Sequence, residues 1–459
     1  MKISTVDINE IADSFRLDSS YYLSEGSVAN RLIQNSIKAG VEYISLGDER
    51  IINIWQPGRN VLVYGGDGEV TVPYLQPYDI LEFVPISRAE ISSHQNDLES
   101  LKVKPGTLLL TCSGRNLGPL VISDEYLEQF VFGSDLIRMD VYDEDLKYYL
   151  FAFLSTWIGQ ALLHSNKTGS VIDHLSKKDV AALSIPLLSE KIYSAASEAM
   201  RDSYRLFANA RMTLSKAQNE FVDFVKIERE NKKLRGGWTV DFRELFNANR
   251  IDAAYFDPYT KEAAQSLKSI GGSKMKEIAD VIKPSGRYKT NYVEKEYGKP
   301  LLSGRQLLQE QIVGLKYLPR NRVDVYKEFV LEKNTIAFPA DGRVEGRLGT
   351  PTFITSSRAG WFGSGHIERV IPHEGIHPGY VYLAFSHPVV QAQIFSIACG
   401  SVVDAVYSTD VENIVVPPMI DFDYDSIVKS WEQIDKAKEL KVKACDIITE
   451  EMTKYNDQA

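Results

Sequence analysis

The sequence predicts an α+β protein in which two tandem copies of a β-rich, loop-rich domain are separated by two long helices. We expect these helices to pack as an antiparallel coiled coil with pseudo-twofold symmetry. Three observations predict this fold class: two repeated segments, β-type patterning within each repeat, and a long amphipathic stretch after each repeat. The chain has 459 residues, of which 44% are hydrophobic and 25% are charged. Such a chain typically forms two or three globular domains.

The opening segment of each repeat carries the clearest match. Residues 5–22 align without gaps with residues 239–256, and seven of the 18 positions are identical, where unrelated sequences would share about one. The ends of the repeats match too, because GSVID at 169–173 returns as GSVVD at 400–404. The two matches lie 234 and 231 residues apart, so the repeats have nearly equal length.

Short apolar stretches interrupted by turn-forming residues predict β-strands in the first repeat. The stretches are residues 51–55, 60–64 and 107–111. Helical periodicity follows at 146–164, and the second repeat has an apolar helix near 378–398. Each repeat is therefore expected to be a β-rich body followed by an apolar helix.

A long amphipathic stretch follows each repeat, at 189–235 and at 424–456. Apolar residues recur in both at steps of three and four, which is the helical period. We expect the two apolar stripes to bury each other; the alternative is that each helix packs on its own domain. The expected divisions are a first domain at 1–188, a long spacer helix at 189–236, a second domain at 237–417 and a second long helix at 418–459.

Signatures of catalysis are missing from the sequence. It contains no GxGxxG that opens a helix after a strand, no Walker A sequence, no HExxH and no GxSxG. The amino-methyltransferase tetrapeptide (N/D)PP(Y/F) is absent as well, since Asp257-Pro258-Tyr259 lacks the second proline. We therefore expect a non-catalytic chain.

The three cysteines are far apart, without CxxC spacing, which argues against a disulfide framework or a zinc site and fits a reducing compartment. No apolar run approaches the roughly 20 residues that span a bilayer, and the N-terminus has no signal-peptide core. We expect a cytoplasmic protein without a metal site.

Two pairs of acidic residues recur at matching places, Asp173 with Asp404 and Asp179 with Asp410. They could be catalytic carboxylates, but capping of turns or helix starts is the favoured interpretation, because each pair recurs in the same context. His373 and His377 share a loop rich in Pro and Gly, where helical ligand spacing is not expected.

The order of these features resembles the specificity subunit of type I restriction–modification systems. GSVIDHLS at 169–176, KKDV at 177–180 and IPLL at 185–188 carry the resemblance, with counterparts GSVVD at 400–404, DV at 410–411 and VPP at 416–418. The chain departs from the family at Ser189-Glu190-Lys191, where a glutamine is common, and at Tyr407-Ser408-Thr409, where Leu-Ser is usual. A divergent relative in a related antiviral defence system is the alternative.

The resemblance implies two target-recognition domains that read a bipartite site in double-stranded DNA, one half-site each. It implies two copies of a DNA adenine methyltransferase subunit as partners, which bring S-adenosylmethionine and flip the target base, and a translocating restriction nuclease subunit. The competing interpretation is a non-catalytic protein-binding adaptor of a defence complex. The acidic first half of the chain supports that competitor, and the net charge of −10, taken alone, argues against a nucleic-acid binder without excluding one.

Arginine-containing polar loops are the candidate DNA-binding elements, because arginine reads guanine and asparagine reads adenine, while lysine holds phosphates. For any single arginine, the alternative is a solvated surface charge or a local ion pair. The candidates are Arg59, Asn60, Arg115 and Asn116 in the first repeat, and Arg287, Tyr288, Lys289, Asn291, Arg305, Arg343, Arg347 and Arg358 in the second.

Charge is distributed unequally between the repeats. Residues 285–369 hold 14 Lys and Arg against 9 Asp and Glu, whereas residues 41–138 hold 7 against 14. Because phosphate attraction depends on basic side chains, the second repeat is expected to contribute more of the affinity for DNA.

Overall fold

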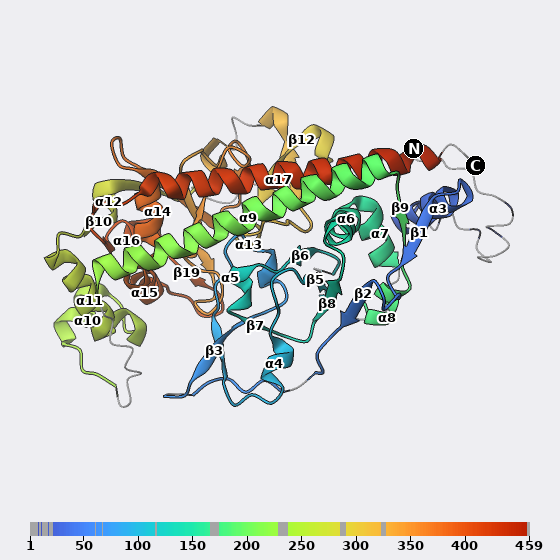
Figure 1. Ribbon diagram of the computed structural model, residues 1–459. Coiled ribbons are helices and arrows are strands. Elements are labelled where there is room, and N and C mark those ends of the chain that lie inside the picture. Colours follow the sequence, from blue (N-terminus) through green and yellow to red (C-terminus); the bar gives the residue numbers. More distant parts are fainter. Residues whose placement is uncertain are drawn as a thin grey trace. The chain divides into compact units, whose positions relative to one another are not determined.

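The computed structural model describes residues 8, 11, 17, 22–59, 61–66, 68–114, 117–165, 174–227, 237–284, 291–322 and 327–456. The chain forms two compact units, and Figure 1 shows the course of the chain through its helices and strands. Unit 1 comprises Met1–Leu81, Pro85–Ala208 and Lys436–Ala459, and unit 2 comprises Glu82–Val84 and Asn209–Asp435. Among the described residues, none of the helices combines the length and apolarity that crossing a membrane requires.

The first repeat, apart from Glu82–Val84, lies in unit 1. Its strands are β1 (Glu42–Ser45), β2 (Ile52–Trp55), β3 (Thr71–Leu75), β4 (Ala89–Ser92), β5 (Leu108–Thr111), β6 (Leu120–Ile122), β7 (Val131–Phe132), β8 (Leu136–Val141) and β9 (Ser184–Leu187). Its helices are α3 (Glu25–Lys38), α4 (Leu98–Leu101), α5 (Glu125–Glu128), α6 (Glu144–Ser155), α7 (Trp157–Ser165) and α8 (Lys177–Ala181). The sheets have the orders β2-β8-β5-β6, β4-β3-β7 and β1-β9.

The second repeat lies in unit 2. Its strands are β10 (Ser273–Lys274), β11 (Ala279–Ile282), β12 (Gly298–Leu302), β13 (Lys316–Pro319), β14 (Ile336–Pro339), β15 (Asp341–Gly342), β16 (Thr352–Phe353), β17 (Phe362–Gly363), β18 (Ile367–Pro372), β19 (Asp404–Ala405) and β20 (Val415–Val416). Its helices are α10 (Phe242–Ala248), α11 (Pro258–Ser269), α12 (Met275–Ile278), α13 (Gly304–Leu307), α14 (Pro378–Ser386), α15 (Pro388–Ile397) and α16 (Ser408–Val411). The sheet orders are β11-β18-β14-β16, β13-β12-β17, β10-β20 and β15-β19.

The first three sheets of unit 2 repeat the strand order of unit 1. β3 pairs antiparallel with β4 and parallel with β7, and β12 makes the same two pairings with β13 and β17. A buried anchor also recurs: Tyr149 donates to the carbonyl oxygen of Pro186 over 2.7 Å, and Tyr380 donates to that of Pro417 over 2.6 Å. The predicted α+β fold with two copies of a β-rich domain is confirmed.

A glycine turn recurs between β5 and β6 in the first repeat and between β14 and β16 in the second. Gln160 donates to the carbonyl oxygen of Gly118 over 2.9 Å, and Gln391 donates to that of Gly349 over 3.0 Å. The two glycines have φ values of +107° and +72°, a region that glycine adopts without the steric cost of a side chain. The turn is thus part of the duplicated scaffold.

In the second repeat, the opening segment (residues 239–256) caps the C-terminal end of α15. Arg250 pairs with Asp252 over 2.7 Å and stacks on the ring of Tyr255, 4.5 Å from its centroid. Its guanidinium also donates to the last carbonyl oxygens of α15 and its cap, over 2.7 and 3.0 Å, where a cation complements the helix dipole. This arrangement explains the Arg, Asp and Tyr of the motif; their counterparts in residues 16–21 lie outside the described residues.

Some local predictions differ from the structure. The stretches at 51–55 and 107–111 form β2 and β5, as predicted, whereas within 60–64 the described residues form only an isolated bridge at Tyr64. The predicted helix at 146–164 is two helices, α6 and α7, separated at Thr156. The Thr156 hydroxyl accepts the backbone N–H of Gly159 over 3.0 Å and so starts α7 as a new helix.

The long helices are α9 (Glu190–Val225), with 36 residues, and α17 (Tyr424–Thr453), with 30. α17 and the short 3₁₀ turn at Lys454–Asn456 match the predicted range of 424–456. α9 is shorter than the predicted 189–236, because Lys226 turns to a φ of +40°. Residues 228–236 lie outside the described part of the chain.

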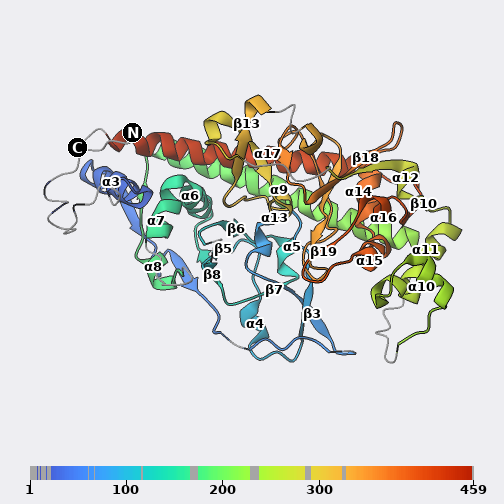
Figure 2. The same cartoon turned by 180° about the vertical axis from the view of Figure 1, so that it is seen from behind.

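Within each unit, the segments of α9 and α17 that belong to it lie side by side (Figures 1 and 2). In unit 1, Ser203 of α9 donates to the carbonyl oxygen of Ala437 in α17 over 2.7 Å. In unit 2, Phe221 of α9 packs edge-on against Tyr424 at the start of α17, with ring centroids 6.5 Å apart. Residue numbers rise along one helix as they fall along the other, which confirms the predicted antiparallel pair.

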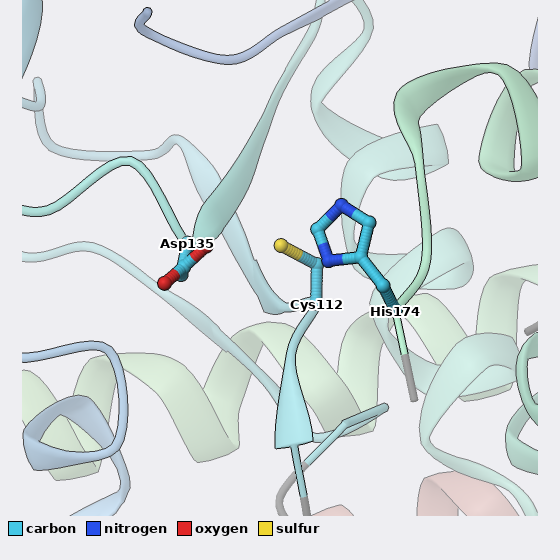
Figure 3. Close-up of side chains that lie close together, drawn as sticks. All are labelled: Cys112, Asp135 and His174. Atoms are coloured by element: carbon cyan, nitrogen blue, oxygen red, sulfur yellow. The ribbon is translucent and has the colours of Figure 1, made fainter. Parts of the chain in front are cut away.

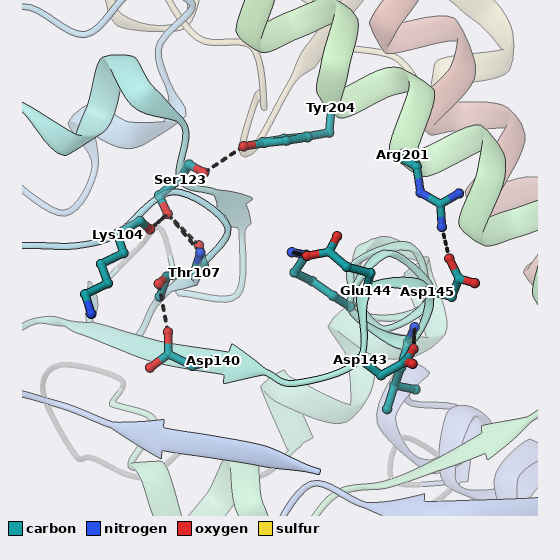
Figure 4. Close-up of polar contacts among 11 residues, drawn as sticks. Lys104, Thr107, Ser123, Asp140, Asp143, Glu144, Asp145, Arg201 and Tyr204 are labelled. Carbon is teal, nitrogen blue, oxygen red and sulfur yellow. Dashed lines mark hydrogen bonds and ion pairs between the residues drawn. The ribbon is translucent and has the colours of Figure 1, made fainter.

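Each long helix also packs on a repeat, so the alternative packing contributes as well. In unit 1, the hydroxyl of Tyr204 donates to the carbonyl oxygen of Ser123 over 3.1 Å, and Arg201 pairs with Asp145 (Figure 4). In unit 2, Asp435 of α17 accepts from the hydroxyl of Thr355 over 2.8 Å. The long helices therefore contact both each other and the repeats.

Candidate nucleic-acid interface

The candidate DNA-binding loops of each repeat leave one edge of its four-stranded sheet. β8 runs antiparallel to both β2 and β5, so the chain leaves those strands at the edge where it enters β8. β18 stands in the same relation to β11 and β14. The loops that begin after Trp55, Thr111, Ile282 and Pro339 therefore start at equivalent edges.

In the first repeat, the described candidate is Arg59. Its side chain is 72% exposed and lies 3.4 Å from the carboxylate of Asp135, which precedes β8. Ser113, at the start of the second loop, approaches the same carboxylate at 3.3 Å. The fold thus brings the two predicted loops of this repeat together. Asn60, Arg115 and Asn116 lie outside the described residues.

In the second repeat, Arg343 and Asn291 are exposed. Arg343 follows β15 in the loop that begins at the end of β14. Arg305 is exposed too, but it lies in α13 after β12 and so belongs to the three-stranded sheet. Arg287, Tyr288 and Lys289 lie outside the described residues.

The other two candidates make contacts inside unit 2. Arg347 pairs with Glu82, which is 4% exposed. Arg358 is 2% exposed and donates to two backbone carbonyl oxygens, with the ring of Phe83 4.4 Å from its guanidinium carbon. Burial lowers the pKa of Arg358 to about 10. Because these contacts hold both side chains within the unit, we leave them out of the candidate interface.

Two buried arginines at equivalent positions were not singled out by sequence reasoning. Arg138 is fully buried and donates to the carbonyl oxygens of Leu101 and Phe132, over 3.4 and 3.3 Å. Arg369 donates to the carbonyl oxygens of Val330 and Glu328, over 2.6 Å each. Their shared position in the repeats was the signal that could have marked them as structural.

A cluster of ionisable groups lies at the sheet edge of the second repeat. The ammonium of Lys283 lies 3.7 Å from Asp341 and 3.6 Å from Glu368, and His366 also pairs with Asp341. Glu368 is fully buried, and burial raises its pKa to about 7. At this edge a protein cation thus sits between two carboxylates.

The equivalent edge of the first repeat holds Cys112, Asp135 and His174 (Figure 3). One potential ligand atom from each lies within 4.8 Å of the others. The hydroxyl of Ser113 is 2.8 Å from Nδ1 of His174, and burial raises the pKa of Cys112 to about 11. Sequence reasoning missed this cluster because its members are far apart along the chain.

The recurring carboxylates take structural roles where they are described. Asp179 forms a capping box with Ser176 at the start of α8, as predicted. Asp404 accepts a backbone N–H over 3.2 Å, and Asp410 lies in the first turn of α16. Asp173 lies outside the described residues.

His373 and His377 contact different carboxylates. Nε2 of His373 lies 3.2 Å from Asp280, and Nε2 of His377 lies 3.2 Å from Asp425. Separate partners of this kind fit two local contacts and not a shared ligand site.

Comparisons with known proteins found similarity among solved structures. No family model matches the chain, and no curated protein matches it. The type I restriction-modification S subunit from M. genitalium is 13% identical, with a TM-score of 0.32 over 91% of this chain and 96% of that chain. The HsdS subunit from Thermoanaerobacter tengcongensis is 12% identical, with a TM-score of 0.28 over 90% and 96%. A chain from a structure of the type I R-M system is 12% identical, with a TM-score of 0.27 over 91% and 97%.

Proposed function

We propose that this chain is the sequence-specific DNA-recognition subunit of a type I restriction–modification complex or of a related defence system. It reads a bipartite site, with one repeat for each half-site. One observation carries the proposal: the repeats share strand order, register and buried anchors, but their sheet edges carry different side chains. Gln56, Ser113 and Asp135 of the first edge stand where the second has Lys283, Asp341 and His366. Two different half-sites present different base edges, so reading them requires side chains with different hydrogen-bond donors and acceptors.

The exposed side chains of the second repeat support contact with DNA. Arg343 and Asn291 are exposed, and the surrounding residues 285–369 have a basic surplus. Arginine and asparagine supply the bidentate contacts that distinguish guanine and adenine. Arg59 offers the same chemistry in the first repeat once its contact with Asp135 opens.

The paired helices support a second part of the proposal, in which they act as a ruler: a rigid spacer that fixes the distance between the two half-sites. α9 and α17 each continue from one unit into the other, because the units divide α9 after Ala208 and α17 after Asp435. A helix rises 1.5 Å per residue, so their length sets the separation of the half-sites in the proposed mechanism.

The repeated opening segments, residues 5–22 and 239–256, support the binding of two copies of one partner protein. Ile8 and Leu17 are 74% and 87% exposed in the first repeat, and their counterparts Phe242 and Ile251 are 77% and 91% exposed in the second. Large apolar side chains at equivalent exposed positions fit an interaction surface that occurs twice. We propose that each binds one copy of the adenine methyltransferase, and that S-adenosylmethionine and catalysis belong to that partner.

Selection from a random duplex library tests the proposal. The full chain, alone and with the co-encoded methyltransferase, is expected to enrich a split motif with a fixed gap. The rival function, a protein-binding adaptor, is favoured by the acidic balance of residues 41–138. Binding of the methyltransferase without any enriched motif under either condition would establish the adaptor instead.

A matched insertion tests the ruler. Seven residues added to α9 after Ala208 and seven added to α17 after Asp435 keep the apolar stripes nearly in phase. They lengthen both helices by about 10 Å, which is about three base pairs. The selected gap should grow by that amount, while insertion into an exposed loop such as that at Gly314 leaves it unchanged. An unaltered gap with both half-sites retained argues against the ruler.

A further inference from the structure

The backbone contacts fix which residues are equivalent at the two sheet edges. Cys112 donates its N–H to the carbonyl oxygen of Asp135 over 3.4 Å, and Ala340 donates to that of His366 over 2.9 Å. The isolated bridge between Ser113 and His174 likewise corresponds to the pairing of Asp341 with Ala405. Cys112, Asp135 and His174 therefore stand where the second repeat has Ala340, His366 and Ala405.

A positive charge occupies this edge in the second repeat. Lys283 lies within 3.7 Å of both Asp341 and Glu368. By strand register its counterpart in the first repeat is Gln56, whose amide nitrogen donates to the carbonyl oxygen of Ser134 over 2.5 Å and lies 3.6 Å from the thiol of Cys112. The first repeat thus replaces the ammonium with a neutral amide.

The first edge gains donor atoms at the same time. Alanines of the second repeat correspond to a thiol and an imidazole here, and a carboxylate lies beside them. In Figure 3 the sulfur of Cys112 lies between the side chains of Asp135 and His174. Zn²⁺ prefers thiolate, imidazole and carboxylate ligands in a tetrahedral arrangement, and the three candidate ligand atoms lie within 4.8 Å of one another.

We propose that Cys112, Asp135 and His174 bind a Zn²⁺ ion in the first repeat, which supplies the positive charge that Lys283 supplies in the second. Nδ1 of His174 faces the other two side chains, because it lies 2.8 Å from the Ser113 hydroxyl, which is 3.3 Å from Asp135 and 4.0 Å from the sulfur of Cys112. The amide nitrogen of Gln56 lies 3.6 Å from the thiol of Cys112.

The order in which Ser113, His174 and Asp135 contact one another fits a metal site better than the catalytic triad of a hydrolase. In a Ser-His-Asp triad the histidine stands between the serine and the carboxylate. Here the hydroxyl of Ser113 is the bridging group, 2.8 Å from His174 and 3.3 Å from Asp135. A bound ion would join the end of β5, the start of β8 and the segment before α8.

Metal titration of the full chain tests this inference independently of DNA recognition. After treatment with a chelator, the protein is titrated with Co²⁺ and then Zn²⁺. One Co²⁺ per chain should give a thiolate-to-cobalt charge-transfer band, and Zn²⁺ should displace it. Zn²⁺ should also raise the urea midpoint of the wild-type chain, because a ligand that binds only the folded state stabilises it.

The second repeat supplies the test variants. Cys112→Ala and His174→Ala install the residues that stand at the equivalent positions, Ala340 and Ala405, and so suit this fold. Each should weaken Zn²⁺ binding more than about 100-fold, beyond the usual effect of changing a group that only supports a ligand. Cys399→Ala, which alters a cysteine of unit 2, should bind as the wild type does.

Two results would overturn the inference: no stoichiometric ion in the wild type, or a charge-transfer band that persists in Cys112→Ala. If circular dichroism shows that Cys112→Ala does not fold, His174→Ala decides. Unchanged Zn²⁺ affinity in that variant means that the cluster is a hydrogen-bonded network without a metal.

Discussion

The hydroxyl of Tyr149 joins α6 to the segment that leads into the long helix α9, by donating to the carbonyl oxygen of Pro186 over 2.7 Å. The N–H of Leu188 approaches the same hydroxyl at 3.4 Å. Tyr380 and Pro417 repeat the bond in unit 2 at 2.6 Å. In both repeats, therefore, a buried tyrosine sets where the chain leaves the domain.

Removal of either hydroxyl should destabilise its own unit. Tyr149→Phe and Tyr380→Phe leave a buried carbonyl oxygen without its donor, which typically costs about 1–3 kcal/mol. Urea denaturation followed by circular dichroism measures the change. Tyr142→Phe is the control, because Tyr142 is 63% exposed; a loss as large as that of Tyr149→Phe would mean that the buried bond is not the cause.

Removal of Arg343 should weaken binding to the selected DNA site. If its guanidinium reads a guanine, Arg343→Ala loses about 1–3 kcal/mol and relaxes selectivity at one position. A gel-shift titration with the selected site and with single-base variants measures both effects. Lys268→Ala removes the same charge from an exposed position in α11. Equal losses in the two variants would reduce the role of Arg343 to general electrostatics.

The stability of unit 2 should fall as pH rises through neutrality. Burial raises the pKa of Glu368 from its ordinary value of 4.5 to about 7, with Lys283 opposing the shift and Asp341 and Glu412 adding to it. The folded state therefore holds this proton more tightly than the unfolded state does. The resulting stabilisation is complete below the ordinary pKa and is lost as pH rises towards 7 and above.

Glu368→Gln tests that pH dependence, because an amide does not titrate. The difference in free energy of unfolding between variant and wild type should change from pH 5 to pH 8 in favour of the variant. Urea titrations at several pH values measure it. Glu374→Gln alters an exposed carboxylate and should leave the slope unchanged; a constant difference for Glu368→Gln would contradict the prediction.

Loss of one opening surface should remove one partner. Phe242→Ser with Ile251→Ser makes these two exposed positions of the second repeat polar, while Ile8 and Leu17 of the first repeat are unchanged. We expect the complex with the methyltransferase to change from two copies to one, as measured by light scattering. An unchanged stoichiometry would place the docking surfaces elsewhere.

Sequence patterns alone predicted the duplication, the β-rich repeats and the two long helices. Those features depend on local periodicity and on similarity between segments, which survive without any knowledge of packing. The stop of α9 at Val225 could not be predicted, because the charged residues that follow it are compatible with a helix. The helix ends because the backbone of Lys226 adopts a positive φ of +40°.

The candidate DNA-binding residues were likewise predictable only in part. The sequence identified arginine-rich loops, and Arg59 and Arg343 do lie exposed beside the sheet edges. It could not show that Arg358 is buried on backbone carbonyl oxygens. A guanidinium satisfies its donors either in solvent or on a neighbouring carbonyl, and only the packing decides which.

The sequence by itself determined that the protein has two similar domains with a long helix after each, and which residue types its loops offer. The tertiary structure alone decided that Cys112, Asp135 and His174 meet at one sheet edge, where Lys283 lies in the other repeat. Strand register determines which residues meet: the antiparallel pairing of β5 with β8 brings Cys112 and Asp135 together although they are far apart along the chain.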